Sequence, residues 1–171
     1  MSYAIVYDSR TGNTEALARA VAAALPSEGR LAFGRVDEVD RAAVAQADRV
    51  YAGFWTNRGD CGDELAEVLA LLADKDVFLF GTAGFGADET YFAGVMARVA
   101  VHLPESARIV GTFMCQGRMP ASVRARYAQT AEAKPEQAAR MHQLIENFDE
   151  AASHPDDDDL ARLREAVQAA S

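Results

Sequence analysis

The stretch Tyr3-Ala4-Ile5-Val6-Tyr7-Asp8-Ser9-Arg10-Thr11-Gly12-Asn13-Thr14 decides the fold of this chain. Its first five residues form an apolar run that predicts a buried strand, and apolar residues recur at helical spacing from about Asn13 to Leu25. Hydroxyl and amide side chains crowd the turn in between, where the free backbone N–H groups of a helix start would lie. A strand, a hydrogen-bonding turn and a helix in this order predict a parallel sheet with an anion site at its edge.

The rest of the chain repeats this alternation of short apolar runs and longer helical patterns. We expect strands at 3–7, 31–36, 49–54, 77–81 and 108–114. We expect helices at 13–25, 41–46, 63–72, 91–101, 121–133 and 136–152, and a last one after the acidic run 156–159. The pattern predicts an α/β fold with a doubly wound five-stranded parallel sheet, and two strand orders fit it. In either order a ligand binds at the carboxyl ends of the strands, where the loops after the first, third and fourth strands meet.

Length and charge bound the class of protein. The 171 residues suit one domain, and the formal net charge of −9 disfavours nucleic acid and anionic membranes as partners. That charge favours docking with basic protein surfaces. No apolar run is long enough to span a bilayer and the first residues show no signal peptide, so we expect a cytoplasmic protein.

Cysteine, histidine and the acidic run do not predict a metal site. Cys61 and Cys115 match no metal or redox spacing, and the three histidines form no ligand cluster with them. The run Asp156 to Asp159 lacks the spaced ligands of a calcium loop. It predicts a capped, solvated helix start, because carboxylates are stabilised at a helix N-terminus.

The turn at residues 9–14 predicts a phosphate site. Five of its six residues carry hydrogen-bonding side chains, which is more than a helix cap requires. No Gly-Lys-Ser/Thr follows, so it is not a nucleoside-triphosphate loop, and the spaced glycines of a dinucleotide fingerprint are missing. We therefore expect a terminal phosphate monoester.

The sequence Ser-Arg-Thr-Gly-Asn-Thr resembles the loop that binds the phosphate of flavin mononucleotide (FMN) in flavodoxins, [ST]-x-T-G-x-T. The resemblance implies a flavodoxin-like sheet of order 2-1-3-4-5 with extra C-terminal helices. It also implies cofactor contacts from Ser9, Arg10, Thr11, Gly12, Asn13 and Thr14. Asp8 departs from the family, which has glycine there. Arg10 is a charge at the variable position, and it either adds to phosphate binding or faces solvent.

The segment after the third strand resembles the flavodoxin loop whose tryptophan stacks on the isoalloxazine ring. Its candidate contacts are Phe54, Trp55, Thr56, Asn57, Arg58 and Gly59. Trp55 is the one tryptophan in the chain, and the alternative is that it closes an edge of the core. In the family a backbone carbonyl of this loop turns to accept a hydrogen bond from flavin N5. The peptides among Thr56, Asn57 and Arg58 are the candidates here, and Asn57 suits such a change because asparagine tolerates unusual backbone angles.

The segment Phe80 to Phe92 resembles the second flavin-edge loop of the family. Backbone N–H groups of Thr82, Ala83 and Gly84 would bind the pyrimidine edge, and either Tyr91 or Phe85 would cover the other face of the ring. The match extends through Gly111 to Pro120, which resembles the fifth strand and its turn. We expect an FMN-binding domain at 1–150 and a C-terminal helical extension of the same domain at 151–171.

These resemblances imply an electron carrier with one non-covalent FMN, no catalytic side chain and a monomeric state. An FMN-dependent quinone or small-molecule reductase and a flavin-free accessory protein remain as alternatives. A two-component receiver is disfavoured, because no lysine lies between Lys75 and Lys134. The Gly-Phe-Trp-Thr, Phe-Gly-Thr-Ala-Gly and Met-Cys-Gln-Gly-Arg-Met-Pro segments are similar to a subgroup encoded beside gut bacterial bilirubin reductases. That similarity implies redox partner proteins, a reductase donor and an acceptor enzyme such as a bilirubin reductase.

Overall fold

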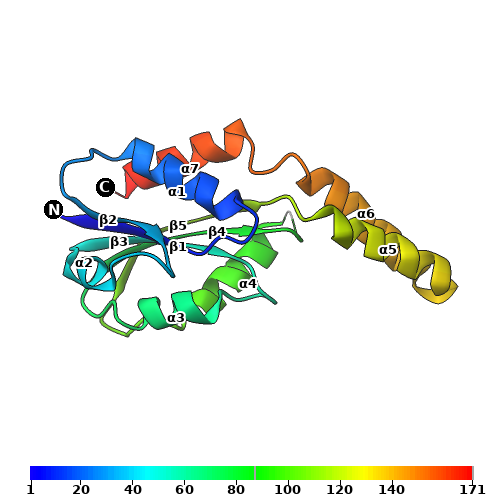
Figure 1. The fold of residues 1–171 in the computed structure, drawn as a ribbon, viewed down its shortest axis with the longest axis horizontal. Helices are drawn as coiled ribbons and strands as arrows, with labels where there is room; N and C mark the ends of the chain where they lie inside the picture. The colour runs from blue at the N-terminus through cyan, green and yellow to red at the C-terminus, as the bar shows by residue number, and fades with distance from the viewer. Residues whose placement is uncertain (87, 171) are drawn as a thin grey trace.

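One parallel sheet of order β2-β1-β3-β4-β5 forms the centre of the molecule (Figure 1), which confirms the predicted order. The computed structural model describes residues 1–86 and 88–170. The strands are β1 (Tyr3–Tyr7), β2 (Arg30–Arg35), β3 (Arg49–Trp55), β4 (Asp76–Ala83) and β5 (Arg108–Gln116). Both β4 and β5 run two residues beyond their predicted ends, so Thr82 and Ala83 belong to a strand rather than to a loop.

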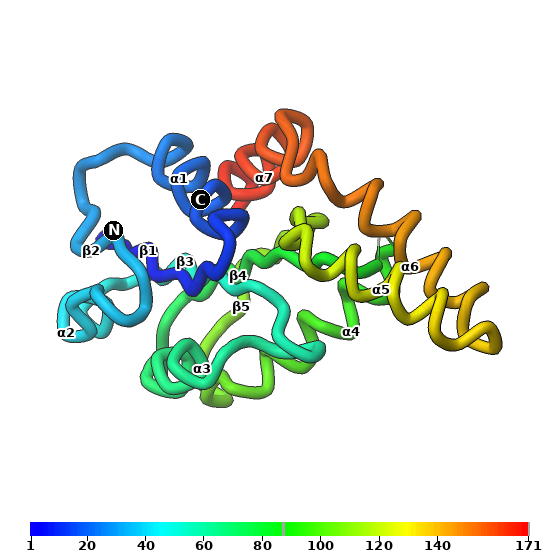
Figure 2. Tube along the Cα trace, turned by 45° about the vertical axis from the view of Figure 1, so that its right-hand side comes forward, coloured from blue at the N-terminus to red at the C-terminus, as the bar shows by residue number. Residues whose placement is uncertain are grey.

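Helices cover both faces of the sheet (Figure 1). One face carries α1 (Asn13–Ala24) and α7 (Asp157–Ala169), and the other carries α2 (Arg41–Gln46), α3 (Asp63–Leu69) and α4 (Glu89–Ala100). A short 3₁₀ turn (Pro135–Gln137) joins α5 (Ala121–Ala133) to α6 (Ala138–Ala151). These two helices lie side by side and project beyond the sheet (Figures 1 and 2). Among the described helices, none is long and apolar enough to cross a membrane.

Two apolar layers hold the helices to the sheet. Leu17 and Val21 of α1 and Leu163 and Val167 of α7 are fully buried on one face of the sheet, where α1 contacts β1, β3 and β4 and α7 contacts β5. Buried leucines and valines of α2, α3 and α4 pack on the other face. The central strands are therefore covered on both sides, as the uninterrupted apolar runs of a parallel sheet require.

A reciprocal pair of contacts joins β3 to β4 just below the predicted ligand edge. Gly53 faces Phe80 across the two strands, and Phe54 faces Gly81 in the next pair. A β-carbon on either glycine would collide with the ring opposite, so each phenylalanine lies over a residue without a side chain. Phe54 is consequently a core residue rather than a contact of the predicted site.

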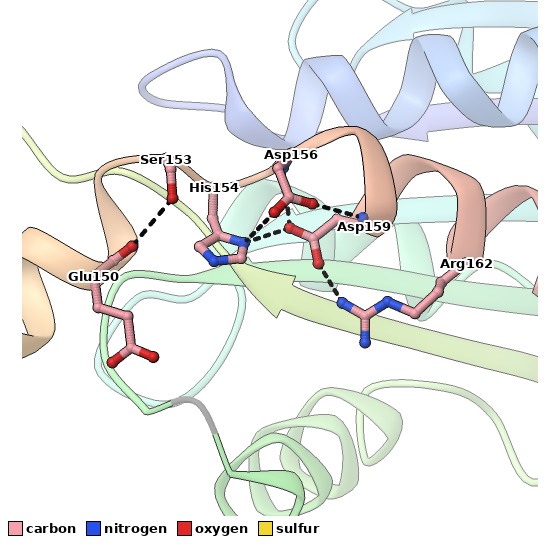
Figure 3. A network of polar contacts seen from close by, with 6 residues as sticks. All are labelled: Glu150, Ser153, His154, Asp156, Asp159 and Arg162. Atoms are coloured by element: carbon pink, nitrogen blue, oxygen red, sulfur yellow. Dashed lines mark hydrogen bonds and ion pairs between the residues drawn. The ribbon is translucent and has the colours of Figure 1, made fainter.

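A buried carboxylate anchors the start of α7 (Figure 3). Asp156 caps the helix in a reciprocal capping box with Asp159, which confirms the predicted capped start. The acidic run is not wholly solvated, because Asp159 is only 1% exposed. Its Oδ2 atom lies 2.5 Å from His154 Nδ1 and accepts a hydrogen bond from the Asp156 N–H at 3.0 Å. Arg162 pairs with the other oxygen, so the buried charge is fully partnered.

Candidate functional site

A cleft of about 850 Å³ opens at the carboxyl edge of the sheet. The loops after β1, β3 and β4 meet there as predicted, and the loop after β5 together with α4 and α5 completes the walls. The predicted site residues that line it are Arg10, Thr11, Asn13, Trp55, Thr56, Arg58, Gly59, Thr82, Ala83, Gly84, Phe85 and Tyr91.

The loop after β1 presents free donors at the start of α1. Gly12 has a φ of 88°, a left-handed angle that glycine adopts without strain. Asn13 Nδ2 donates to Thr11 Oγ1 at 3.1 Å and to the Arg118 carbonyl at 2.9 Å, which joins this loop to the loop after β5. In the described part of the chain, no acceptor takes the backbone N–H groups of residues 10–14. Such a helix start attracts an anion.

Two side chains of this loop support it from behind instead of lining the cleft. Ser9 Oγ accepts a hydrogen bond from the Glu15 N–H at 3.2 Å. Thr14 is fully buried, and its hydroxyl lies 3.1 Å from the Thr82 hydroxyl, which ties the first loop to the end of β4. Their contribution to a ligand would come through the backbone they hold in place.

The indole of Trp55 is held between two charged side chains. Its Nε1 donates to Asp8 Oδ2 at 2.9 Å, and the Arg10 guanidinium lies 5.5 Å from the ring centroid. Burial raises the pKa of the Asp8 carboxyl, and the hydrogen bond from Trp55 opposes that shift. A β-carbon at Gly62 would lie 2.7 Å from the Asp8 carboxylate, so Gly62 leaves room for this contact. Asp8, a departure from the flavodoxin pattern, thus fixes the ring orientation.

The loop after β3 forms a tight two-residue turn. Asn57 and Asp60 exchange two backbone hydrogen bonds, at 2.7 and 3.0 Å. The residues between them, Arg58 with a φ of 52° and Gly59 with a φ of 88°, are both left-handed, as in a type I′ turn. The left-handed angles therefore lie at Arg58, one of the three residues whose peptides were the candidates, and at Gly59, but not at Asn57.

Helix α4 and the turn that follows it hold this two-residue turn in place. Arg98 Nε donates to the Gly59 carbonyl at 2.6 Å, and His102 Nε2 lies 3.1 Å from both carboxylate oxygens of Asp60. The fold thus brings His102 close to Asp60 and Cys61, which their spacing in the sequence did not predict. Burial raises the pKa of the Cys61 thiol to about 12, so this thiol is neutral near pH 7.

The loop after β4 and the first turn of α4 each place one aromatic ring at the cleft. Phe85 and Tyr91 pack edge to face, with centroids 5.8 Å apart and planes at 83°. Asp88 caps α4 by accepting a hydrogen bond from the Tyr91 N–H at 2.7 Å. Both rings line the cleft, so the geometry leaves both as candidates to cover a flat ligand.

Several residues at the cleft were not predicted. They come from α4, from the turn after β5 and from α5: Arg98, Gly117, Arg118, Met119, Pro120, Ser122, Val123, Arg126 and Tyr127. Asn147 of α6 supports the site from behind, because its Nδ2 donates to the Gly84 carbonyl at 2.9 Å while its Oδ1 accepts from the Gly86 N–H at 3.3 Å. Gly117, which follows the fifth strand, could have indicated this turn from the sequence, because the fifth strand ends at the same edge of the sheet as the other strands.

The polar atoms of the cleft fit a phosphorylated, flat ligand. Within the described ranges, Asn13 Oδ1 and Thr56 Oγ1 are buried without a hydrogen-bond partner, and buried polar atoms normally have one. An anion would take the free N–H groups of the first loop, while hydroxyl groups of the same ligand would reach Asn13 and Thr56. The clamped indole of Trp55 offers a flat apolar wall.

Comparison with known proteins agrees with this geometry. The family model described as a flavodoxin domain matches residues 4–168. A flavodoxin-like domain-containing protein BilS of Clostridium symbiosum is 37% identical over 177 aligned positions, covering 96% of this chain and 93% of that protein. A BilS of Clostridioides difficile is 27% identical, covering 94% and 90%. The crystal structure of oxidised Flavodoxin 2 from Bacillus cereus shares the fold, with a TM-score of 0.60, 16% identity and 99% and 97% coverage. The chain thus belongs to the flavodoxin family, in the group that includes both BilS proteins, and it is a flavodoxin-type flavoprotein.

Proposed function

We propose that the chain binds one non-covalent FMN in this cleft and carries electrons to a partner reductase as a cytoplasmic monomer. The observation that carries the proposal is the row of backbone N–H groups at the start of α1 that have no partner among the described residues, next to the clamped indole of Trp55. A crystal structure titled as a flavoprotein in complex with FMN, from Lactobacillus acidophilus, shares the fold at 12% identity and a TM-score of 0.53. The similarity to the subgroup encoded beside bilirubin reductases makes such a reductase the first acceptor to test.

Each part of the site has a defined task in this proposal. The first loop binds the phosphate through backbone N–H groups, the Thr11 hydroxyl and the Arg10 guanidinium. Asp8 orients Trp55 for offset stacking on the ring, and the turn at Arg58 and Gly59 covers the ring edge. When bound, FMN supplies the electron-transfer chemistry, so the protein only binds, shields and tunes it.

A second candidate is an FMN-dependent reductase of quinones or other small molecules. The cleft continues past the three flavin loops onto α5, where Val123, Arg126 and Tyr127 form a wall that a substrate could contact. Steady oxidation of NADPH by a quinone without an added reductase would establish this candidate. An electron carrier alone gives no such turnover.

The first test compares FMN with riboflavin, which lacks the phosphate. We expect FMN to bind about 100-fold more tightly, because charge-assisted hydrogen bonds to the phosphate each contribute about 1.5–3 kcal/mol. Titration of the flavin-free chain, followed by flavin fluorescence, measures both affinities. Equal affinities would show that the first loop does not bind the phosphate, and a chain that binds neither flavin would refute the proposed function.

The second test concerns Asn147, which lies outside the cleft. Asn147→Ala removes the side chain that ties Gly84 and Gly86 to α6, and we expect FMN to bind about tenfold more weakly, since an unmade buried hydrogen bond costs about 1–3 kcal/mol. Gln143→Ala on the exposed face of the same helix is the matched control and should leave affinity unchanged. A wild-type affinity in Asn147→Ala would show that α6 does not support the site.

A further inference from the structure

Positive charge is concentrated around the cleft of this acidic chain. Five arginines line it: Arg10, Arg58, Arg98, Arg118 and Arg126. Among the described residues, no aspartate, glutamate or lysine lines it, although the formal net charge of the whole chain is −9. All five arginines are exposed, so the positive charge is presented to solvent around the mouth of the site.

None of these five arginines is neutralised by a carboxylate within the described part of the chain. Arg10 lies over the Trp55 ring, Arg98 donates to the Gly59 carbonyl, and Arg126 lies 5.8 Å from the Tyr127 centroid. Seven arginines elsewhere do form ion pairs: Arg19, Arg35, Arg41, Arg49, Arg108, Arg124 and Arg162. Of the eight arginines without an ion pair in the described residues, five therefore line this one cleft, while the other three, Arg30, Arg140 and Arg164, lie on β2, α6 and α7.

This charge exceeds what the cofactor needs. A phosphate monoester carries a charge of about −2 at neutral pH, which leaves about three of the five arginines uncompensated. The nearby carboxylates Asp8 and Asp60 contact Trp55 and His102, and neither side chain lines the cleft. Asp37, Asp63 and Glu64 line a separate hollow that adjoins the cleft at Arg10 and Trp55.

The cleft mouth has the composition of a protein interface. Phe85 is 50% exposed, and Met119, Val123 and Tyr127 are half-buried between the arginines. Arginine, methionine and aromatic residues are enriched in interfaces, usually as an apolar centre inside a polar rim. A site for a small anion would instead hold buried, converging donors. Here the arginines come from separate elements and are exposed, so the arrangement favours a protein partner.

We propose that the redox partner docks an acidic surface segment on this arginine rim. This inference rests on the proposed electron-carrier function and reverses the expectation, drawn from net charge alone, of a basic partner. The acidic remainder of the chain repels the same segment, so the partner is oriented with its acidic surface toward the flavin edge.

The single tryptophan allows a test that needs no flavin. Trp55 fluorescence in the flavin-free chain is quenched with iodide and, separately, with caesium, each scaled to free N-acetyltryptophanamide. We expect the scaled iodide constant to exceed that of caesium about threefold at low salt, because a positive local potential concentrates anions. The triple variant Arg58→Gln, Arg118→Gln, Arg126→Gln should abolish the preference. The control triple Arg30→Gln, Arg140→Gln, Arg164→Gln, with the same charge change at exposed arginines elsewhere, should keep it. A caesium preference in the wild type would overturn the proposal.

A labelled hexaglutamate peptide then serves as the acidic partner segment for the FMN-loaded chain. We expect it to bind at low salt, about tenfold more weakly at physiological ionic strength, and not to bind the first triple variant. Equal competition by glutarate at matched carboxylate concentration would indicate a small-anion site instead. A low-salt dimer that only the first triple variant abolishes would indicate a second copy of this chain, and either result overturns the proposal. Because quenching is measured without flavin, a chain that binds no FMN yet prefers iodide refutes only the electron-carrier function.

Discussion

A chain truncated after Asp156, which lacks α7, is expected to remain unfolded. Leu163 and Val167 of this helix are 0% exposed and complete the apolar layer on the α1 face. Burial of one such side chain contributes about 1.5–3 kcal/mol, and the net stability of a domain is only about 5–15 kcal/mol. Without α7, the apolar face formed by Phe80, Cys115 and Leu17 would also be opened to water. Circular dichroism during urea unfolding measures the loss.

A single substitution makes this expectation quantitative. Leu163→Ala should lower the free energy of unfolding by about 3 kcal/mol, since the methyl groups leave a cavity that the neighbouring helix cannot fill. Leu71→Ala is the matched control, because Leu71 is 57% exposed and its loss should cost less than about 0.5 kcal/mol. A truncated chain that unfolds cooperatively at the wild-type midpoint would show that α7 is an appendage.

The second large effect is expected at Gly81. In Gly81→Ala the new methyl group meets the Phe54 ring, which is fully buried and has no space to move into. Overpacking of this kind costs about 1–3 kcal/mol, and we expect the upper end because β3 and β4 are both central strands. The melting temperature, measured by circular dichroism, should fall by several degrees.

Two further variants separate steric collision from an ordinary loss of strand stability. Gly34→Ala on β2 is the control, because its new β-carbon would lie 3.5 Å from Val39, an ordinary contact. Adding Phe54→Leu to Gly81→Ala should restore part of the lost stability, since the smaller side chain relieves the collision. If the double variant loses as much stability as the two single variants lose together, the Phe54 ring and the new methyl group at position 81 do not compete for the same space.

Most of the cleft could be predicted from the sequence, because the patterns that mark it are formed by neighbouring residues. A strand that ends in a glycine- and hydroxyl-rich turn must place that turn at the carboxyl edge of a parallel sheet, which is why the loops carrying Thr11, Trp55 and Thr82 meet. The same reasoning missed Arg98 and Asn147. Both lie on helices whose local pattern is ordinary, and each contacts the site through a residue distant in sequence, Gly59 and Gly84 respectively.

The family, the parallel sheet and the position of the turn at residues 9–14 were determined by sequence alone, because strand periodicity and the chemistry of one turn are properties of neighbouring residues. Tertiary structure decided the rest. It buried Asp159 in the first turn of α7, placed Asp8 against Trp55, and brought five arginines from separate elements into one rim. The net charge is a sum over the whole sequence, whereas the electrostatic potential at a surface depends on how far each charge lies from it. A chain of net charge −9 can therefore still present a positive face.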